Sequence, residues 1–254
     1  LIFEKYKVKR LYLSNFLDKP EKLLMAKTSG DIYFLDDGLA TITIFHKGFD
    51  RFFFGSDKGS YRLKYFIFCV VLLLTYRAFP FPLKRVAGKI RKYITTFPLV
   101  IPGVDTETIS PPFKCKQRCV KMTRSVFFIG QNLYASPKLI SHADYYARVA
   151  KVMNHYKSAG LEFCYFPHPR EFDIPRVLQE KSKVIECAFE SYVTEFSDEM
   201  PLVVAGFLST ALPTLKSIGV GLQVEAWRLL SEQFAEFDYI YDYFNLLGIP
   251  VLEC

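Results

Sequence analysis

The sequence has little of what marks several large classes of protein. Among 254 residues it has one Trp, four His and six Cys, and the cysteines form no recognisable disulfide framework. Cys115 and Cys119 have a CxxxC spacing, but no His or Cys pair follows at the distance of a zinc site. Cys69, Cys164 and Cys187 lie within apolar runs, as small buried side chains do. This usage fits a reduced, cytoplasmic compartment.

No apolar run is long enough for a transmembrane helix. The most apolar stretch lies between Lys64 and Arg77 and has about 12 residues, well short of the roughly 20 that span a bilayer. We interpret it as a buried helix or strand. The sequence opens with Leu1 rather than Met, so we expect a fragment of a longer protein, and the lack of a signal peptide carries no weight.

Aromatic and basic residues are abundant. Phe and Tyr number 25 and 16, which indicates a packed globular protein rather than a disordered one. The formal net charge of +7 predicts an anionic partner, either nucleic acid, an acidic membrane surface or a phosphate-bearing substrate. Because the basic residues are scattered and no nucleic-acid-binding module is present, nucleic acid is the weakest of these partners. The alternative is an ordinary solvated surface.

The first part of the chain predicts a few strands and two helices. Strands are expected within Tyr6–Leu13 and at Gly30–Leu35, and Leu39–Phe45 continues with β-branched residues. Ser60–Tyr76 and Leu83–Ile94 have helical patterns. The second of these helices is basic and amphipathic, as in helices that lie on a membrane surface or on another domain.

A Pro-rich, irregular passage at about 96–121 predicts a linker between two domains, residues 1–121 and residues 122–254. In the second domain apolar strands and amphipathic helices alternate, which predicts a doubly wound α/β sheet of parallel strands. The expected strands are Ser125–Gln131, Leu161–Phe166, Val184–Ala188, Pro201–Phe207, Val220–Ala226 and Ile249–Leu252; the expected helices are Ile140–Tyr156, one opened by Ser209 or Thr210, Arg228–Phe237 and Tyr239–Leu247.

A His residue is held between two prolines directly after one of these strands. His168 lies between Pro167 and Pro169, and Arg170 follows. Proline restricts its own backbone and that of the residue before it, so the imidazole has little conformational freedom. A His can protonate a leaving group, and Arg can bind phosphate by two contacts. A structural or surface His is the alternative.

Two further polar motifs follow predicted strands. Ser209 and Thr210 combine hydroxyls with the free N–H groups of a helix start, which together bind anions; the alternative is a plain N-cap. Gly130-Gln131 ends a strand of the same sheet and could add another N–H donor. Asp36-Asp37-Gly38 follows the strand at 30–35 and could supply a general base. An ordinary acidic turn is the alternative, and the motif is weak support for a metal site.

The order of DDG, FFIGQ, HP, Phe-Glu and a Ser/Thr pair resembles the lipooligosaccharide sialyltransferase family (glycosyltransferase family 52), which has relatives among bacterial polysialyltransferases. The resemblance covers roughly residues 30–220. It implies a GT-B fold, in which two Rossmann-like domains face each other across a cleft. Because the acidic motif lies so near the start of this sequence, we expect the N-terminal, acceptor-side domain to be truncated.

The resemblance also implies an activity, an inverting and metal-independent transfer of sialic acid from CMP-sialic acid, without a cofactor. The acceptor would be a terminal sugar, with galactose favoured, of lipooligosaccharide or a capsule-like glycan. By the same resemblance Asp36 is the general base, supported by Asp37, and His168 protonates or stabilises the departing CMP phosphate. The residues implied to bind CMP are Gly130, Gln131, Pro169, Arg170, Glu190, Ser209 and Thr210.

The implied partners are CMP-sialic acid and a glycan acceptor on lipid or capsule, with no nucleic acid. The implied location is the cytoplasm, with peripheral contact to the inner membrane, and a homodimer is a possible assembly. Two alternatives stay open. One is a polysialyltransferase or another transferase of CMP-activated keto sugars, and the other is a degenerate GT-B protein that binds glycan or membrane without turnover.

Overall fold

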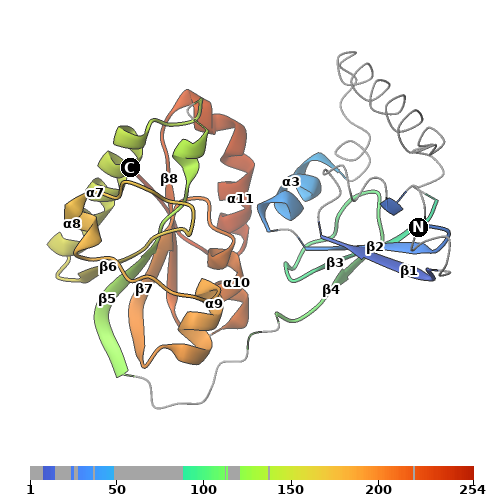
Figure 1. Cartoon of the computed structure of the whole chain (residues 1–254), viewed down its shortest axis with the longest axis horizontal. Helices are drawn as coiled ribbons and strands as arrows, with labels where there is room; N and C mark the ends of the chain where they lie inside the picture. The colour runs from blue at the N-terminus through green and yellow to red at the C-terminus, as the bar shows by residue number, and fades with distance from the viewer. Residues whose placement is uncertain are drawn as a thin grey trace. The chain divides into compact units, whose positions relative to one another are not determined.

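The structure is a computed structural model of the chain, drawn in Figure 1. It describes residues 8–14, 24–25, 28–36, 38–48, 88–111, 113, 121–136, 138–219 and 221–254. The chain divides into two compact units, Leu1–Ile109 and Ser110–Cys254. Each unit contains a sheet of parallel strands, so the fold is mixed α/β and compatible with a Rossmann-like architecture. The predicted helix at Ser60–Tyr76 lies outside the described residues.

The first unit contains a four-stranded sheet with the order β1-β2-β3-β4. Alternate residues of the strands point into its core, as the period of two in a strand requires. Ile32, Phe34 and Tyr93 are fully or almost fully buried. The elements are β1 (Arg10–Leu13), β2 (Asp31–Leu35), α3 (Leu39–Lys47), β3 (Ile90–Thr95) and β4 (Thr106–Thr108).

Two segments of this unit differ from their predicted structure. Leu39–Phe45 is rich in β-branched residues, yet it lies in helix α3. The helix begins directly after Gly38, which has a φ of 59°. A positive φ is accessible to Gly, and it turns the chain out of the strand direction. Ile90–Ile94, predicted as the end of a helix, lies in strand β3 because it pairs with β2 and β4 on both sides. In β3, tertiary pairing has overridden the local spacing of the apolar residues.

The second unit contains a five-stranded parallel sheet with the order β6-β5-β7-β8-β9. The strands are β5 (Lys121–Ile129), β6 (Glu162–Phe166), β7 (Glu199–Gly206), β8 (Gln223–Arg228) and β9 (Val251–Glu253). The helices are α7 (His142–Ser158), α8 (Arg176–Gln179), α9 (Phe189–Ser191), α10 (Ala211–Ile218) and α11 (Asp238–Leu246), with helical turns η1 (Leu133–Ala135), η2 (Tyr192–Phe196) and η3 (Glu232–Phe237).

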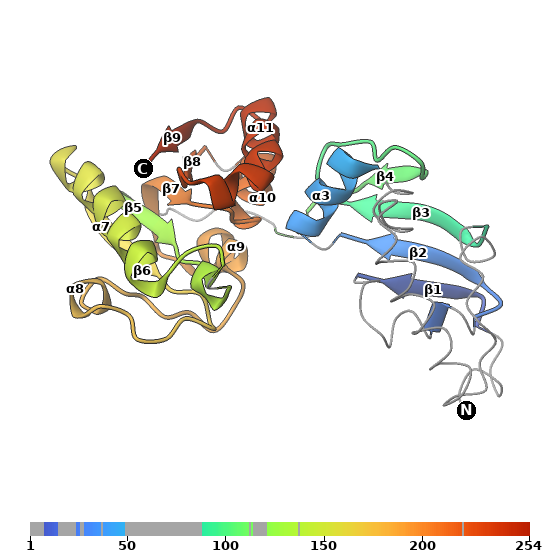
Figure 2. The same ribbon diagram turned by 90° about the horizontal axis from the view of Figure 1, so that it is seen from above.

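Helices cover both faces of this sheet, and Figure 2 shows α7 on one side and α9, α10 and α11 on the other. On the α7 face the ring of Phe128 stacks on those of Phe163 and Tyr165. On the opposite face Phe127 and Phe166 pack against η2 and α9. Burial on both faces explains why these strands are nearly continuous apolar runs.

Most of the elements predicted for this half are confirmed, with two differences. Val184–Ala188 is not a strand; Val184 is 81% exposed, and it is the preceding residues 181–183 that pair with Tyr165 of β6. The helix expected at Arg228–Phe237 is the shorter turn η3. Strand β4 lies within the passage predicted as a linker at 96–121, and β5 begins at Lys121. Among the described helices, none has both the length and the apolar character needed to cross a membrane.

Candidate functional site

Three of the predicted polar motifs lie at the carboxyl edge of the second sheet. Strand β5 has β6 on one side and β7 on the other, so the strand order reverses there. In open α/β sheets ligands bind beyond the carboxyl ends of the strands at such a reversal. Gly130-Gln131 follows β5, His168–Arg170 follows β6, and Ser209-Thr210 follows β7. Residues from three separate parts of the sequence therefore share one sheet edge.

The Gln131 side chain joins the ends of β5 and β7. Its amide nitrogen donates to the carbonyl of Leu208, and its Oε1 accepts a hydrogen bond of 2.7 Å from the Leu208 N–H. Both polar ends of the amide are therefore bonded to one residue, the one that precedes Ser209. A reciprocal pair of this kind holds the loop after β7 in register with the loop after β5.

Gly130 lies where the chain must approach other side chains closely. Its N–H donates to the carbonyl of Phe166 over 2.7 Å, which joins the ends of β5 and β6. A Cβ atom at this position would lie 2.5 Å from Oη of Tyr165 and 2.7 Å from Oε1 of Glu171. Only a residue without a side chain fits there, so the Gly has a packing reason that is separate from any contact with a ligand.

His168 presents one ring nitrogen outward. Its Nδ1 accepts a hydrogen bond of 3.1 Å from the Arg170 N–H, so in the neutral ring the proton is on Nε2. Partial burial, and then the positive charge of Arg170, lower the pKa of His168 below its ordinary value. The exposed side chain therefore offers a neutral N–H donor in the free protein, next to the exposed side chain of Arg170.

Ser209 and Thr210 begin helix α10. The buried Ser209 Oγ accepts a hydrogen bond of 3.3 Å from the Ala211 N–H, and Thr210 is the N-cap residue. The capping alternative therefore holds for Ser209. A hydroxyl that accepts a hydrogen bond keeps its own proton as a donor, so the cap does not remove its capacity to bind an anion.

Glu171 is a residue of this edge that the sequence did not reveal. Its two carboxylate oxygens accept hydrogen bonds from the hydroxyls of Tyr145, over 3.1 Å, and Tyr165, over 2.7 Å. Tyr145 in turn accepts one of 2.7 Å from the Gln131 N–H, and the Glu171 N–H donates to the carbonyl of His168 over 2.9 Å. Burial raises the pKa of Glu171 despite these donors. Its only signal in the sequence is its place directly after the HPR motif.

Glu190 lies on the β6–β7 connection, in the short helix α9. Burial raises the pKa of its carboxyl group. Within the part of the chain that the structure describes, no hydrogen bond joins this carboxylate to another predicted site residue. Its implied contact with ribose or base stays a prediction.

Asp36 belongs to the first unit and is enclosed by donors from that unit. Its Oδ1 accepts hydrogen bonds from the Gly38 N–H, over 3.1 Å, and from the Thr41 hydroxyl. Its Oδ2 accepts three more, from the Thr95 hydroxyl (3.1 Å), the Thr96 N–H (3.1 Å) and the Thr96 hydroxyl (2.9 Å). A carboxylate has about four lone-pair sites, so its acceptor capacity is full. Asp37 lies outside the described residues.

The carboxyl edge of the second sheet carries neutral and cationic donors suited to an anion. They are the His168 ring, the Arg170 guanidinium and the hydroxyls at the start of α10. The described residues contain no group of three or more His, Cys, Asp or Glu that could hold a metal ion. Comparisons with models of protein families, with curated proteins and with solved structures find no match for this chain. The resemblance to sialyltransferases therefore depends on the order of the motifs alone.

Proposed function

We propose that the chain is part of an inverting GT-B glycosyltransferase that moves sialic acid from CMP-sialic acid to a terminal sugar of lipooligosaccharide or a capsule-like glycan, with galactose as the favoured acceptor. The observation that carries the proposal is the convergence of Gly130-Gln131, His168–Arg170 and Ser209-Thr210 at one sheet edge. These are the residues for which the family resemblance implies contact with CMP.

The proposed chemistry is stabilisation of a departing phosphate. In a direct displacement at the anomeric carbon, negative charge develops on the CMP phosphate as its bond to the sugar breaks. The Nε2–H of His168 and the hydroxyls of Ser209 and Thr210 would donate to that phosphate, and Arg170 would add a positive charge. A bound phosphate also raises the pKa of a neighbouring His, which offsets the lowering in the free protein and lets His168 serve as the acid.

The acceptor hydroxyl requires a base from the acidic motif of the first unit. The carboxylate of Asp36 already accepts five hydrogen bonds, and an oxygen with no free lone pair is a poor proton acceptor. We therefore favour Asp37 as the base and Asp36 as the residue that holds the turn in place. Comparison of Asp36→Asn with Asp37→Asn separates the two roles: loss of transfer without loss of stability identifies the base.

The experiment measures sialic acid transfer from CMP-sialic acid to a galactose-terminated acceptor by mass spectrometry, with the complete natural chain. We expect His168→Ala to lower kcat about 10²-fold or more, since general acid catalysis contributes about 10²- to 10⁴-fold. His155→Ala, in the last turn of helix α7 of the same unit, is the matched control. Undiminished transfer in His168→Ala contradicts the proposal, and the length of the product distinguishes a sialyltransferase from a polysialyltransferase.

A second candidate is a GT-B-like protein that binds nucleotide or glycan without turnover. The exposed His168, whose pKa partial burial and the charge of Arg170 lower, favours it, because a neutral imidazole can bind an anion as a hydrogen-bond donor without transferring its proton. Calorimetry with CMP and CMP-sialic acid distinguishes the two functions when combined with the transfer assay. Binding without transfer favours this candidate, whereas binding with transfer supports the enzyme.

A further inference from the structure

A cavity of about 310 Å³ opens at the carboxyl edge of the second sheet. One wall is formed by residues 138–141 and the first turns of α7, and the other by the segment 229–234 after β8. None of the predicted CMP-binding residues lines it. Ligand pockets are concave, mostly apolar and equipped with a few placed polar groups, with volumes from about 300 Å³ upward. This cavity is at the small end of that range.

Two cationic side chains and one carboxylate line the cavity. The guanidinium of Arg148 is held in place by hydrogen bonds from Nη1 to the carbonyl of Cys254, over 2.6 Å, and from Nη2 to that of Leu230, over 3.5 Å. Arg has five N–H donors, so donors remain for a ligand. Lys138 is exposed on the same side. The Asp144 carboxylate accepts a hydrogen bond of 2.6 Å from the Ser141 hydroxyl. Its negative charge lies on the same lining as the positive charges of Lys138 and Arg148.

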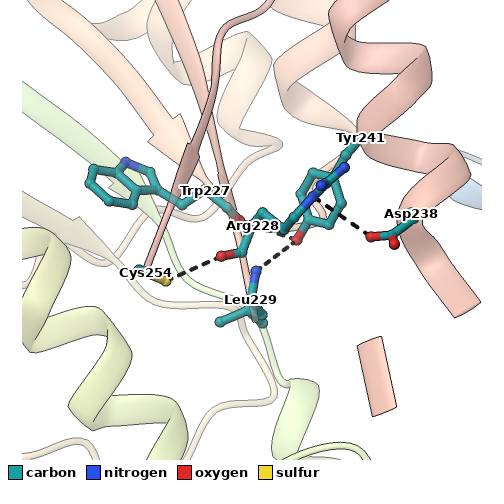
Figure 3. Close-up of polar contacts among 6 residues, drawn as sticks. All are labelled: Trp227, Arg228, Leu229, Asp238, Tyr241 and Cys254. Carbon is teal, nitrogen blue, oxygen red and sulfur yellow. Dashed lines mark hydrogen bonds and ion pairs between the residues drawn. The ribbon is translucent and has the colours of Figure 1, made fainter. Parts of the chain in front are cut away.

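The wall after β8 combines the apolar side chains of Leu229, Leu230 and Phe234 with the polar residues Ser231 and Gln233, and hydrogen bonds hold its base in place. Leu229 and Phe234 line the cavity and are only 3% and 2% exposed. The hydroxyl of Tyr241 donates to the carbonyl of Trp227 over 3.1 Å and accepts from the Leu229 N–H over 3.4 Å, as Figure 3 shows. The wall is therefore preformed and does not have to be ordered by a ligand.

Neighbouring contacts fix the end of β8 as well. Arg228 lies over the ring of Tyr241 and forms an ion pair of 3.6 Å with Asp238, while the thiol of Cys254 lies 3.5 Å from the Arg228 carbonyl (Figure 3). These contacts turn the Arg228 side chain toward α11, so it does not contribute to the charge of the cavity.

From this combination we propose that the cavity binds a small organic monocarboxylate with an apolar body. The two cations bind the carboxylate by charge-assisted hydrogen bonds, and the 47% exposed Leu230, backed by Leu229 and Phe234, contacts the apolar part. The Asp144 carboxylate repels additional negative charge, so a monoanion is favoured over a dianion such as phosphate. This site is independent of the proposed sialyltransferase function, because it uses none of the same residues and its test needs no turnover.

The test uses benzoate, with benzamide as the neutral probe of the same shape and inorganic phosphate as the dianion. Backbone amide NMR of the complete chain measures binding at residues 138–148 and 229–234. We expect benzoate to shift these resonances and benzamide to bind about tenfold more weakly, which is the loss of about one charge-assisted hydrogen bond. Equal binding of the two probes, tighter binding of phosphate, or no shift with benzoate overturns the proposal.

Two variants assign the binding to the cavity. Lys138→Met should weaken benzoate binding several-fold and leave benzamide binding unchanged, because only the charged probe uses the ammonium group. Lys151→Met removes the same charge from an exposed position of α7 outside the cavity and should change neither. Arg148→Lys, with retained thermal stability as the check on folding, should also weaken benzoate selectively. Equal effects of Lys138→Met and Lys151→Met contradict the assignment.

Discussion

The two units both place polar residues where parallel strands end, but those residues differ in how much of their bonding capacity is used. In the first unit the Asp36 carboxylate accepts five hydrogen bonds from its own unit. In the second unit the His168 side chain is exposed, and among the described residues its ring has one hydrogen bond, accepted by Nδ1 from the Arg170 N–H. Polar residues at the same position in a sheet are therefore bonded internally in one unit and exposed in the other.

The strand orders of the two sheets also differ. The described strands of the first sheet follow each other in chain order, β1-β2-β3-β4, whereas the second sheet reverses direction at β5. A reversal separates the loops that follow neighbouring strands and leaves a crevice between them. Polar residues follow strands in both sheets, but among the described strands only the second sheet has such a reversal beside them. Four substitutions test this difference, in order of expected effect.

Asp36→Ala should destabilise the first unit by about 3 kcal/mol or more, because it leaves buried donors without an acceptor. Urea unfolding and amide hydrogen exchange at Gly38 and Thr96 measure the effect. Asp31→Ala is the matched control, since Asp31 makes an exposed ion pair with Arg91 and such pairs contribute about 0–1 kcal/mol. A loss for Asp36→Ala no larger than the control would show that the five hydrogen bonds are not structural.

Gly130→Ala should destabilise the second unit by about 1–3 kcal/mol, the usual cost of overpacking. The added Cβ would meet Oη of Tyr165 and Oε1 of Glu171 at 2.5 and 2.7 Å. Gly206→Ala, at the end of the adjacent strand, is the control, since its Cβ would meet its nearest neighbour, the Ile129 carbonyl oxygen, at 3.4 Å. Thermal unfolding of both variants measures the difference. Equal melting temperatures would contradict a close-packed edge at Gly130.

Gln131→Leu should cost about 1–2 kcal/mol through the loss of two hydrogen bonds to Leu208. It should also increase the hydrogen exchange of the Leu208 amide, because the loop after β7 is no longer joined to β5. Gln179→Leu removes a single exposed hydrogen bond to the carbonyl of Ile174 and is the control for the amide-to-apolar change. If the two variants unfold alike and Leu208 stays protected, the link between the strand ends is unimportant.

Glu171→Gln should change how the free energy of unfolding depends on pH more than it changes the magnitude of that free energy. Burial raises the pKa of Glu171 in the folded protein above its value in the unfolded chain. The stability associated with the protonated group is therefore present below the ordinary pKa of about 4.3 and is lost as the pH rises through the raised value. Urea unfolding from pH 4 to pH 8 should show the wild type losing stability relative to Glu171→Gln across that window.

The control for this titration is Glu180→Gln, at an exposed position 63% accessible in its side chain and paired with Arg176. We expect its stability to stay parallel to that of the wild type over the same pH range. Parallel curves for Glu171→Gln as well would mean that the buried carboxylate does not titrate in this window.

The local pattern of apolar and polar residues was sufficient to predict much of the secondary structure of the second unit. Apolar runs bounded by Gly, Pro and Ser predicted β5, β6 and β7, and helical spacing predicted α7. It was insufficient in the first unit, where the β-branched run at 39–45 forms a helix and 90–94 forms a strand. Both segments are short, and short apolar runs are decided by what they pack against rather than by their own periodicity.

The bonding state of the site residues could not be read from the sequence. The hydroxyls that saturate Asp36 come in part from Thr95 and Thr96, 59 and 60 residues further along the chain. The tyrosines that hold Glu171 come from α7 and β6. Each of these contacts depends on strand register and helix placement, which no local motif encodes.

The sequence by itself determined, to within two residues, where β5, β6 and β7 end and which polar residues follow them, because burial on both faces requires apolar runs that stop at the sheet edge. Only the tertiary structure decided which of those polar residues keep free donors. Strand order brings Gly130, His168 and Ser209 to one edge, and the same packing surrounds Asp36 with donors of its own unit. Hydrogen bonds between distant segments form only when the whole sheet is assembled, so the chemical availability of a residue is a property of the fold.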